Sequence, residues 1–352
     1  MYRVLVVDDS ALLRRLISTA LDRDPEIEVV GTAHDGLDAI EAVDRLRPDV
    51  VTLDVEMPRL DGIGAAEEIH RRHPRLPIIM FSTLTERGAT ATLAALSKGA
   101  SDYVAKPTGV SDPAQAMEKV RADLVPRVKA LAGARRVVTT PRVAAPPSTP
   151  RPAGIVPRLL VIACSTGGPD ALQHVLGGLP EDFGLPVLVA QHMPPVFTHQ
   201  LAERLDRKCR LSVHEATDGE ELVAGRVLIA PGDWHLRVQN RVGRMRAVLD
   251  QGPRENFCRP AADPLLGSAA ATFGASTLCL VLTGMGQDGL IGARAVVEAG
   301  GTVLVQDEAT SVVWGMPGAV ASAGLAHEVL PLDQIPLRLV RLARPALSAA
   351  RD

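Results

Sequence analysis

The feature that most constrains the fold is a regular alternation of short β-branched runs with longer amphipathic stretches. Between Tyr2 and about Ala132, five apolar runs alternate with stretches whose apolar residues recur at helical spacing. The runs are RVLVV, EIEVVG, DVVTL, LPIIMF and SDYVA. Strands that alternate with helices form parallel sheets covered on both faces. We therefore predict that residues 1–125 form a doubly wound, five-stranded parallel α/β domain.

A second alternation follows a change in composition. The stretch RRVVTTPRVAAPPSTPRPAGIVPR is rich in proline, and its X-Pro steps favour extended backbone. Residues 126–157 are thus predicted to hold the end of a helix and a linker. From Arg158, apolar runs such as RLLVIA, LPVLVAQ and STLCLVLTG predict a second α/β domain over 158–345, with a mostly parallel sheet. The polar–apolar alternation in residues 233–250 predicts an antiparallel hairpin.

Composition narrows the class of protein. The 352 residues are 46% hydrophobic and carry a formal net charge of −3, so we expect neither nucleic-acid binding nor a basic membrane-binding surface. The four cysteines are scattered and fit neither a disulfide framework nor a zinc site. We find neither a signal-peptide pattern nor an apolar run near the roughly 20 residues that span a bilayer. The sequence predicts a soluble, cytoplasmic protein without membrane insertion.

Acidic residues follow two strands of the first domain. Asp8 and Asp9 come directly after the first strand, and Asp54 ends the third. The carboxyl ends of parallel strands meet at one edge of a sheet, so these carboxylates should lie together. Clustered acids repel unless a hard cation lies among them, and Mg²⁺ prefers oxygen ligands. Ser82 ends the fourth strand and Lys106 follows the fifth, where a hydroxyl and a cation could contact phosphoryl oxygens.

These positions resemble the receiver domain of response regulators, which is flavodoxin-like in fold. The resemblance implies that Asp54 accepts a phosphoryl group from a chemotaxis histidine kinase, with Mg²⁺ as cofactor. It also implies a set of supporting residues, namely Asp8, Asp9, Asp54 and the carbonyl of Glu56 for Mg²⁺, and Ser82, Tyr103 and Lys106 for the phosphorylation switch.

The second domain opens with LVIACSTGGPDA, residues 160–171, where an apolar run stops at Ser165 and glycines follow. A serine on such a strand-to-helix turn can be a nucleophile with helix amides nearby. The same pattern also fits a helix cap or a phosphate-binding loop. The segment by itself leaves these three roles open.

Two further polar residues follow apolar strands of the second domain. His192 comes directly after LPVLVAQ, and Asp288 lies in a glycine-rich turn after STLCLVLTG. One sheet edge could gather Ser165, His192 and Asp288 as nucleophile, base and orienting acid. Their chain order differs from the Ser-Asp-His order of α/β-hydrolases, so a different fold is expected.

The segments ACSTGGPDAL, QHMPP, TGMGQDG and VVWGMPGAV together resemble the catalytic domain of chemotaxis protein-glutamate methylesterases, the CheB family. The resemblance implies that Ser165 is the nucleophile, His192 the general base and Asp288 its partner. It makes the backbone amides near Thr166 and Met285 candidates for the oxyanion hole. Similar proteins usually have Gly-Ala before this serine, whereas Ala163 and Cys164 precede it here. We interpret Cys164 as a buried small hydrophobe.

By this resemblance the chain hydrolyses glutamyl methyl esters on methyl-accepting chemotaxis receptors and releases methanol. It also implies deamidation of receptor glutamines, activation by phosphorylation and no cofactor for the esterase. Three alternatives remain at this point: a receiver with a DNA-binding output, a receiver that regulates a phosphate- or nucleotide-binding domain, and a non-enzymatic phosphate sink. The acidic balance and the lack of a recognisable helix-turn-helix disfavour the first.

Overall fold

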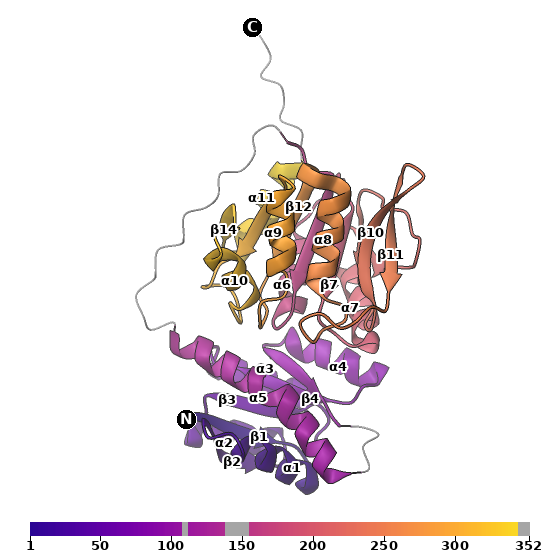
Figure 1. Ribbon diagram of the computed structural model, residues 1–352. Helices are drawn as coiled ribbons and strands as arrows, with labels where there is room; N and C mark the ends of the chain where they lie inside the picture. Colours follow the sequence, from indigo (N-terminus) through magenta and orange to yellow (C-terminus); the bar gives the residue numbers. More distant parts are fainter. Residues whose placement is uncertain (108–111, 138–154, 344–352) are drawn as a thin grey trace. The chain divides into compact units, whose positions relative to one another are not determined.

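The structure of the chain is a computed structural model that describes residues 1–107, 112–137 and 155–343 (Figure 1). These residues fall into two compact units, divided within the segment 138–154. Among the described helices, none combines the length and the apolar character needed to span a bilayer. Most of the predicted linker and the predicted domain end at residue 345 lie outside the described residues, while residue 125 lies inside a helix.

The first unit is a parallel sheet of five strands in the order β2-β1-β3-β4-β5. Helix α1 packs against α5, while α2 packs against α3 and α3 packs against α4. The strands are β1 (Tyr2–Val7), β2 (Ile27–Ala33), β3 (Val50–Asp54), β4 (Ile78–Ser82) and β5 (Asp102–Ala105). The helices are α1 (Ala11–Asp22), α2 (Gly36–Leu46), α3 (Gly62–Arg72), α4 (Glu86–Leu96) and α5 (Pro113–Val137).

Side-chain caps explain where the helices of this unit begin. A hydroxyl or carboxylate precedes each of the first four helices and accepts a hydrogen bond from a backbone amide of its first turn; these caps are Ser10, Asp35, Asp61 and Thr85. At α5 the residue before the helix is Asp112, whose carboxylate accepts the Ala114 amide at 2.9 Å. Ser111, the preceding residue, lies outside the described residues.

The second unit contains a parallel sheet of seven strands in the order β14-β13-β12-β6-β7-β9-β8. The apolar runs form its centre, where every residue of the three middle strands is buried. The strands are β6 (Leu159–Cys164), β7 (Val187–Gln191), β8 (Ser212–Glu215), β9 (Arg226–Ile229), β12 (Thr277–Val281), β13 (Thr302–Gln306) and β14 (Glu328–Leu330).

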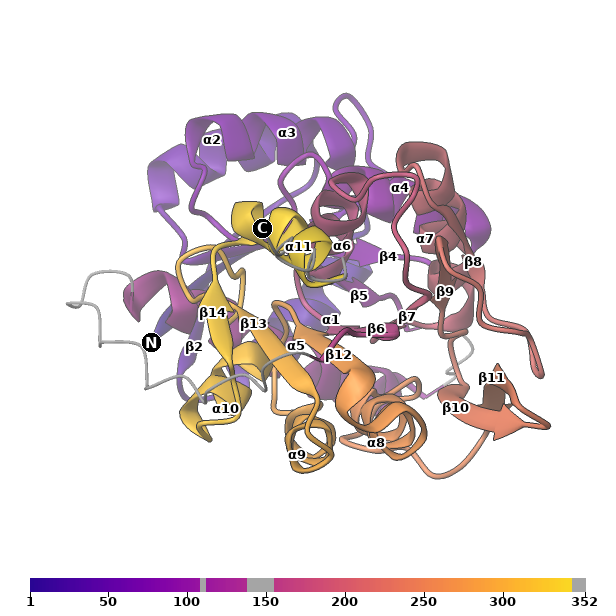
Figure 2. The ribbon, with the colours of Figure 1, turned by 90° about the horizontal axis from the view of Figure 1, so that it is seen from above.

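Helices cover both faces of this sheet, with α8, α9 and α10 on one face and α6, α7 and α11 on the other (Figure 2). A separate antiparallel hairpin, β10 (His235–Arg241) and β11 (Arg244–Asp250), packs against α8. The helices are α6 (Gly168–Gly177), α7 (Pro195–Lys208), α8 (Ala262–Phe273), α9 (Leu290–Glu298), α10 (Met316–Ser322) and α11 (Ile335–Ala343).

The predicted fold class is confirmed for both units, including the antiparallel hairpin within residues 233–250. Two strands of the second sheet, β8 and β14, were not predicted. Both are short edge strands: β14 has three partly exposed residues, and β8 has one buried residue, Val213, among exposed or partly exposed ones. They therefore lack the apolar run that marks the central strands. Cys164 is fully buried, as predicted.

Candidate phosphorylation site and candidate active site

The three acidic residues of the first unit come together at the carboxyl ends of β1 and β3. Carboxylate oxygens of Asp8, Asp9 and Asp54 all lie within 4.8 Å of one another. Asp8 and Asp54 are buried, whereas Asp9 is exposed. The Lys106 ammonium lies 2.7 Å from Asp54 Oδ1 and 3.2 Å from Asp8 Oδ2. The predicted cluster of acids and its cationic neighbour therefore share one edge of the sheet.

The electrostatics of this cluster favour a bound divalent cation. Burial and the negative charge of Asp8 raise the pKa of Asp54 to about 6, against the opposing effects of Lys106 and the Glu56 amide. Asp8 Oδ2 is buried, and within the described residues the Lys106 ammonium at 3.2 Å is the one polar group placed against it. Three carboxylates with one ammonium leave an excess of negative charge on oxygen ligands, which is the donor set that suits Mg²⁺.

Of the remaining predicted residues, Ser82 ends β4 at the same sheet edge, Glu56 lies two residues beyond β3, and Tyr103 is the second residue of β5. Ser82 ends β4, and its hydroxyl donates to the Gly88 carbonyl at 3.1 Å. The Tyr103 side chain is buried, and burial raises its pKa above the usual range. The Glu56 side chain is exposed and lies 3.4 Å from Arg87. Ser82 and Tyr103 are thus held by the protein interior in this structure.

In the second unit, β6 leads through a tight turn into α6 at the glycine-rich segment. Ser165 follows the last residue of β6, and Gly167 has a φ of 75°, a conformation that glycine adopts without strain. A side chain at Gly167 would also meet Val312 at 2.6 Å. The Ser165 carbonyl accepts hydrogen bonds from the Gly168 amide at 2.8 Å and from Gln191 Nε2 at 3.0 Å. The turn is therefore fixed on both sides of the serine.

The sheet register places His192 beside Ser165. Cys164 pairs with Gln191 between β6 and β7, so the residue after each strand stands at the same level of the sheet. The His192 amide donates to the Cys164 carbonyl at 3.2 Å, which ties the two strand ends together. No hydrogen bond joins the Ser165 hydroxyl to the His192 ring among the described residues. Catalytic hydrogen bonds often form fully only when substrate binds, so the lack of this bond does not argue against a nucleophile and its base.

His192 and Asp288 form a direct hydrogen bond. His192 Nε2 lies 2.7 Å from Asp288 Oδ2, and the side chains are only 11% and 2% exposed. A carboxylate only accepts, so Nε2 carries the donated proton and the neutral ring keeps its lone pair on Nδ1. Burial lowers the pKa of His192, but Asp288 and the neighbouring Cys258 outweigh it and hold the pKa above its usual range. This geometry suits a base whose protonated form is stabilised.

The loop after β12 forms the other wall of the site. The Ser165 amide donates to the Thr283 carbonyl at 3.1 Å, so it cannot also donate to an oxyanion. A side chain at Gly284 would lie 2.9 Å from Ser165 Cβ, which shows how closely this loop approaches the serine. Thr166 is buried and its carbonyl accepts the Thr283 hydroxyl at 2.9 Å. Met285 follows Gly284 directly, so its amide lies in the segment that faces Ser165.

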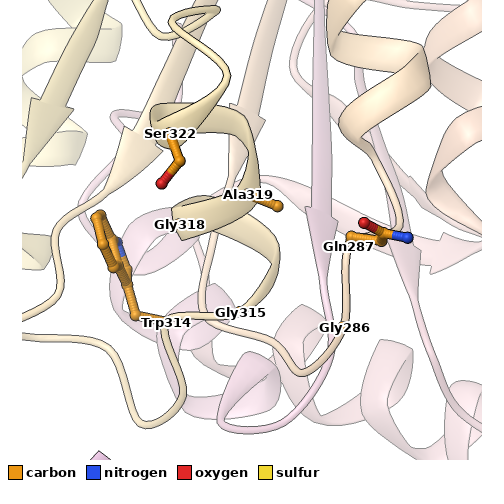
Figure 3. Close-up of a pocket in the computed structure, with 7 residues that line it drawn as sticks. All are labelled: Gly286, Gln287, Trp314, Gly315, Gly318, Ala319 and Ser322. Atoms are coloured by element: carbon orange, nitrogen blue, oxygen red, sulfur yellow. The ribbon is translucent and has the colours of Figure 1, made fainter. Parts of the chain in front are cut away.

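A pocket of about 510 Å³ adjoins this loop (Figure 3). The indole of Trp314 borders one side, and the Gly286–Gln287 segment borders the other. Trp314 Nε1 donates to the Gln306 carbonyl at 2.9 Å, which fixes the ring. The remaining lining residues are small, namely Gly315, Gly318, Ala319 and Ser322. The pocket thus lies beside the loop that holds Met285.

Sequence reasoning missed three residues of this site. Cys258 contacts His192, and Asn256 and Asp263 lie against Asp288. They come from the loop before α8 and from its first turn, neither of which follows a strand of the sheet. The one available signal was a carboxylate, Asp263, at the start of an otherwise apolar helix.

Comparisons with known proteins cover both units. Residues 160–339 match the family model described as CheB methylesterase, and residues 4–119 match the response regulator receiver domain. A protein-glutamate methylesterase/protein-glutamine glutaminase of Nocardioides sp. is 54% identical over 353 residues, covering 97% of this chain and 96% of the relative. Its namesake in Trichodesmium erythraeum is 44% identical over 347 residues, covering 97% and 98%.

A solved structure gives the same result for the second unit. The crystal structure of the Thermotoga maritima CheB methylesterase catalytic domain aligns with a TM-score of 0.52 and 45% identity. It covers 53% of this chain and 100% of that domain. Family model, relatives over nearly the full length and solved structure agree, and the chain therefore belongs to the CheB methylesterase family, with a response regulator receiver domain at its N-terminus.

Proposed function

We propose that the chain is a phosphorylation-regulated protein-glutamate methylesterase, which hydrolyses glutamyl methyl esters on chemoreceptors during chemosensory adaptation. The observation that carries the proposal is the buried His192–Asp288 hydrogen bond at the sheet edge where Ser165 follows the adjacent strand. Membership in the CheB methylesterase family supports the substrate class. The receptors' methylated helices are cytoplasmic in this proposal, and so is the enzyme.

In the proposed first half of the reaction, Ser165 Oγ attacks the ester carbonyl carbon and His192 Nδ1 accepts the hydroxyl proton. Asp288 holds Nε2–H, orients the ring and stabilises the imidazolium. The amides of Thr166 and Met285 are the proposed donors to the oxyanion. Collapse of the tetrahedral adduct breaks the bond to methoxide, and His192 returns the proton so that methanol leaves.

The second half releases the glutamyl side chain. A water molecule gives a proton to His192 and attacks the acyl-serine carbonyl. The bond to Ser165 Oγ then breaks as His192 returns that proton to Oγ, which restores the serine hydroxyl and the free base and releases the glutamate side chain as a carboxylic acid that ionises. A glutamine side chain would pass through the same acyl-serine with ammonia as the leaving group. We therefore also propose glutamine deamidation, which the double name of the two relatives supports.

Phosphorylation of Asp54 is the proposed control. A kinase of the chemosensory pathway is the proposed phosphodonor, and Asp8, Asp9, Asp54 and the Glu56 carbonyl would hold Mg²⁺. When bound, the ion would offset charge on the phosphoryl oxygens. Asp54 supplies the accepting carboxylate. Lys106 lies 2.7 Å from Asp54 Oδ1 and would form an ion pair with the new phosphoryl group. Ser82 and Tyr103 are the proposed switch side chains.

The test of the esterase assignment is methanol release from methylated receptor by the full chain. Ser165→Ala should lose ester hydrolysis while its melting curve stays unchanged. Ser212→Ala, which removes an exposed hydroxyl of β8, is the matched control and should retain full activity. A fluorophosphonate should label Ser165 in the unmodified chain. Full turnover by Ser165→Ala would refute the nucleophile.

The test of the regulatory assignment compares activity with and without a small phosphodonor in the presence of Mg²⁺. The unmodified chain should respond, whereas Asp54→Asn should have the same activity with and without the donor. Absent labelling of Ser165, together with stabilisation by a nucleotide, would favour the alternative that the second unit binds a phosphate-containing ligand. An undiminished response of Asp54→Asn would refute Asp54 as the acceptor.

A further inference from the structure

Asp288 is held by donors on both carboxylate oxygens. Oδ2 lies 2.7 Å from His192 Nε2 and accepts the Ala262 amide at 2.6 Å. Oδ1 accepts the amides of Asp263 at 3.1 Å and Gly289 at 3.0 Å, both near helix starts. These backbone donors fix the carboxylate, and a second side-chain donor, in addition to His192, completes the set.

That donor is the Asn256 amide, and it connects Asp288 to a second buried carboxylate. Asn256 Nδ2 lies 3.0 Å from Asp288 Oδ1 and 3.1 Å from Asp263 Oδ2. An amide nitrogen carries two hydrogens, so it can donate one to each carboxylate. Asn256 has a φ of 50°, a left-handed conformation that asparagine tolerates better than most residues. The residue that bridges the two carboxylates thus has a less common backbone conformation.

Asp263 is buried, as is Asp288 beside it. Asp263 is 7% exposed, and its Oδ1 accepts the Gly292 amide of α9 at 2.7 Å. Its neighbours are Asp288, Asn256, the α9 amide and the buried thiol of Cys279. None of these groups is a cation. The positive charge that can offset the two carboxylates is the imidazolium of His192, which contacts Asp288 on the side away from Asp263.

We propose that Asp263, bridged to Asp288 by Asn256, is a positioning residue that controls how strongly Asp288 supports the charged form of His192. This inference rests on the proposed function, because it assumes that His192 is the base. Asp263 does not touch the ester or Ser165. It acts by adding negative charge behind the carboxylate that holds the imidazole.

The ionisation of Asp263 gives the proposal a direction. Burial and the charge of Asp288 raise the pKa of Asp263 to about 6, against the Gly292 and Asn256 hydrogen bonds. Above that pH, Asp263 carries a negative charge that favours the imidazolium and raises the pKa of His192. Removing the charge should therefore lower the pKa of His192, so the free base should persist to lower pH.

The experiment measures the second-order rate constant for fluorophosphonate labelling of Ser165 in the full chain between pH 5 and 11, a range that spans the raised pKa of His192. Asp263→Asn keeps an oxygen for the Gly292 amide and removes the charge. In the plot of this variant's labelling rate against pH, the acidic limb, where protonation of His192 lowers the rate, should move to lower pH by about 0.5–1 unit. Asp182→Asn removes a charge from an exposed residue of the same unit and should leave the limb in place. Asp263→Ser, with a hydroxyl acceptor, is a second charge-removing variant with the same expected shift.

The outcomes separate the two assignments. A lower rate at every pH with an unmoved limb in both charge-removing variants would make Asp263 merely structural and overturn this inference. A limb that moves to higher pH would also overturn it. Absence of labelling at Ser165 in the unmodified chain would instead refute the proposed nucleophile, whatever Asp263 does.

Discussion

Gly168, the first residue of α6, offers a sharp test of how the turn at Ser165 is held. A methyl group there would lie 2.0 Å from Gln191 Oε1, 2.9 Å from Gln191 Cδ and 3.1 Å from Cys164 Cβ. Gln191 is 1% exposed, and its Nε2 donates to the Ser165 carbonyl. Gly168 does not have a positive φ, so the effect of Gly168→Ala is steric rather than conformational.

The magnitude follows from two losses. Overpacking a close-packed site costs about 1–3 kcal/mol. Displacing Gln191 also removes its hydrogen bond to the Ser165 carbonyl, a loss of about 1 kcal/mol. The free energy of unfolding should fall by about 2–4 kcal/mol in total, which lowers the melting midpoint of a domain this size by roughly 4–15 °C. Because a displacement near 1 Å at a reacting group can cost about 100-fold in rate, methanol release should fall by one to two orders of magnitude.

The assay pairs a melting curve with methanol release, and α6 supplies the control. A side chain at Gly177, the last residue of the same helix, would meet no atom within 4 Å. Gly177→Ala should leave activity unchanged and alter stability by less than about 1 kcal/mol. If Gly168→Ala melts and turns over like Gly177→Ala, then Gln191 does not fix the turn and the reasoning is wrong.

Three further predictions concern packing and reactivity in the second unit. Thr283→Val should cost about 2 kcal/mol and reduce methanol release, because the hydroxyl donates to the Thr166 carbonyl at 2.9 Å in a buried network; an unchanged melting midpoint would contradict this. Phe197→Ala should cost about 3–5 kcal/mol in a denaturant titration, since the ring is fully buried; a loss below 1 kcal/mol would show that the site collapses. Burial raises the pKa of the Cys164 thiol, so iodoacetamide should modify the partly exposed Cys258 first; mass spectrometry of early time points would detect the opposite order.

The alternation of runs predicted the two sheets well because their central strands are apolar throughout. All six residues of β6 and all five of β12 are buried, and such runs are bounded by clear turn residues. Helix α3 begins at Gly62 because the Asp61 carboxylate caps it and accepts the Gly64 amide, a start that the local sequence encodes. Edge strands such as β14 have three partly exposed residues, and their pairing depends on a neighbour that local sequence does not reveal.

The candidate site divides in the same way. His192 and Asp288 could be proposed because each follows a strand, and topology brings strand ends together. Asn256 and Asp263 could not, since they reach Asp288 from a loop and a helix start that are 32 and 25 residues away in the chain. The approach of Cys258 to His192 likewise depends on how that loop folds, which no periodicity encodes.

The paired strand ends at Cys164 and Gln191 limit where residues can be inserted into the second unit. Ser165 directly follows β6 and His192 directly follows β7, and the register between these two strands pairs their last residues. Inserting one residue into β6 or β7 would turn every later side chain of that strand to the opposite face of the sheet. Inserting two would restore the face but advance the strand end by about 7 Å, out of reach of its neighbour. Length variation in this unit should therefore accumulate in segments such as the tip of the β10–β11 hairpin, and spare the two strands that end at the serine and the histidine.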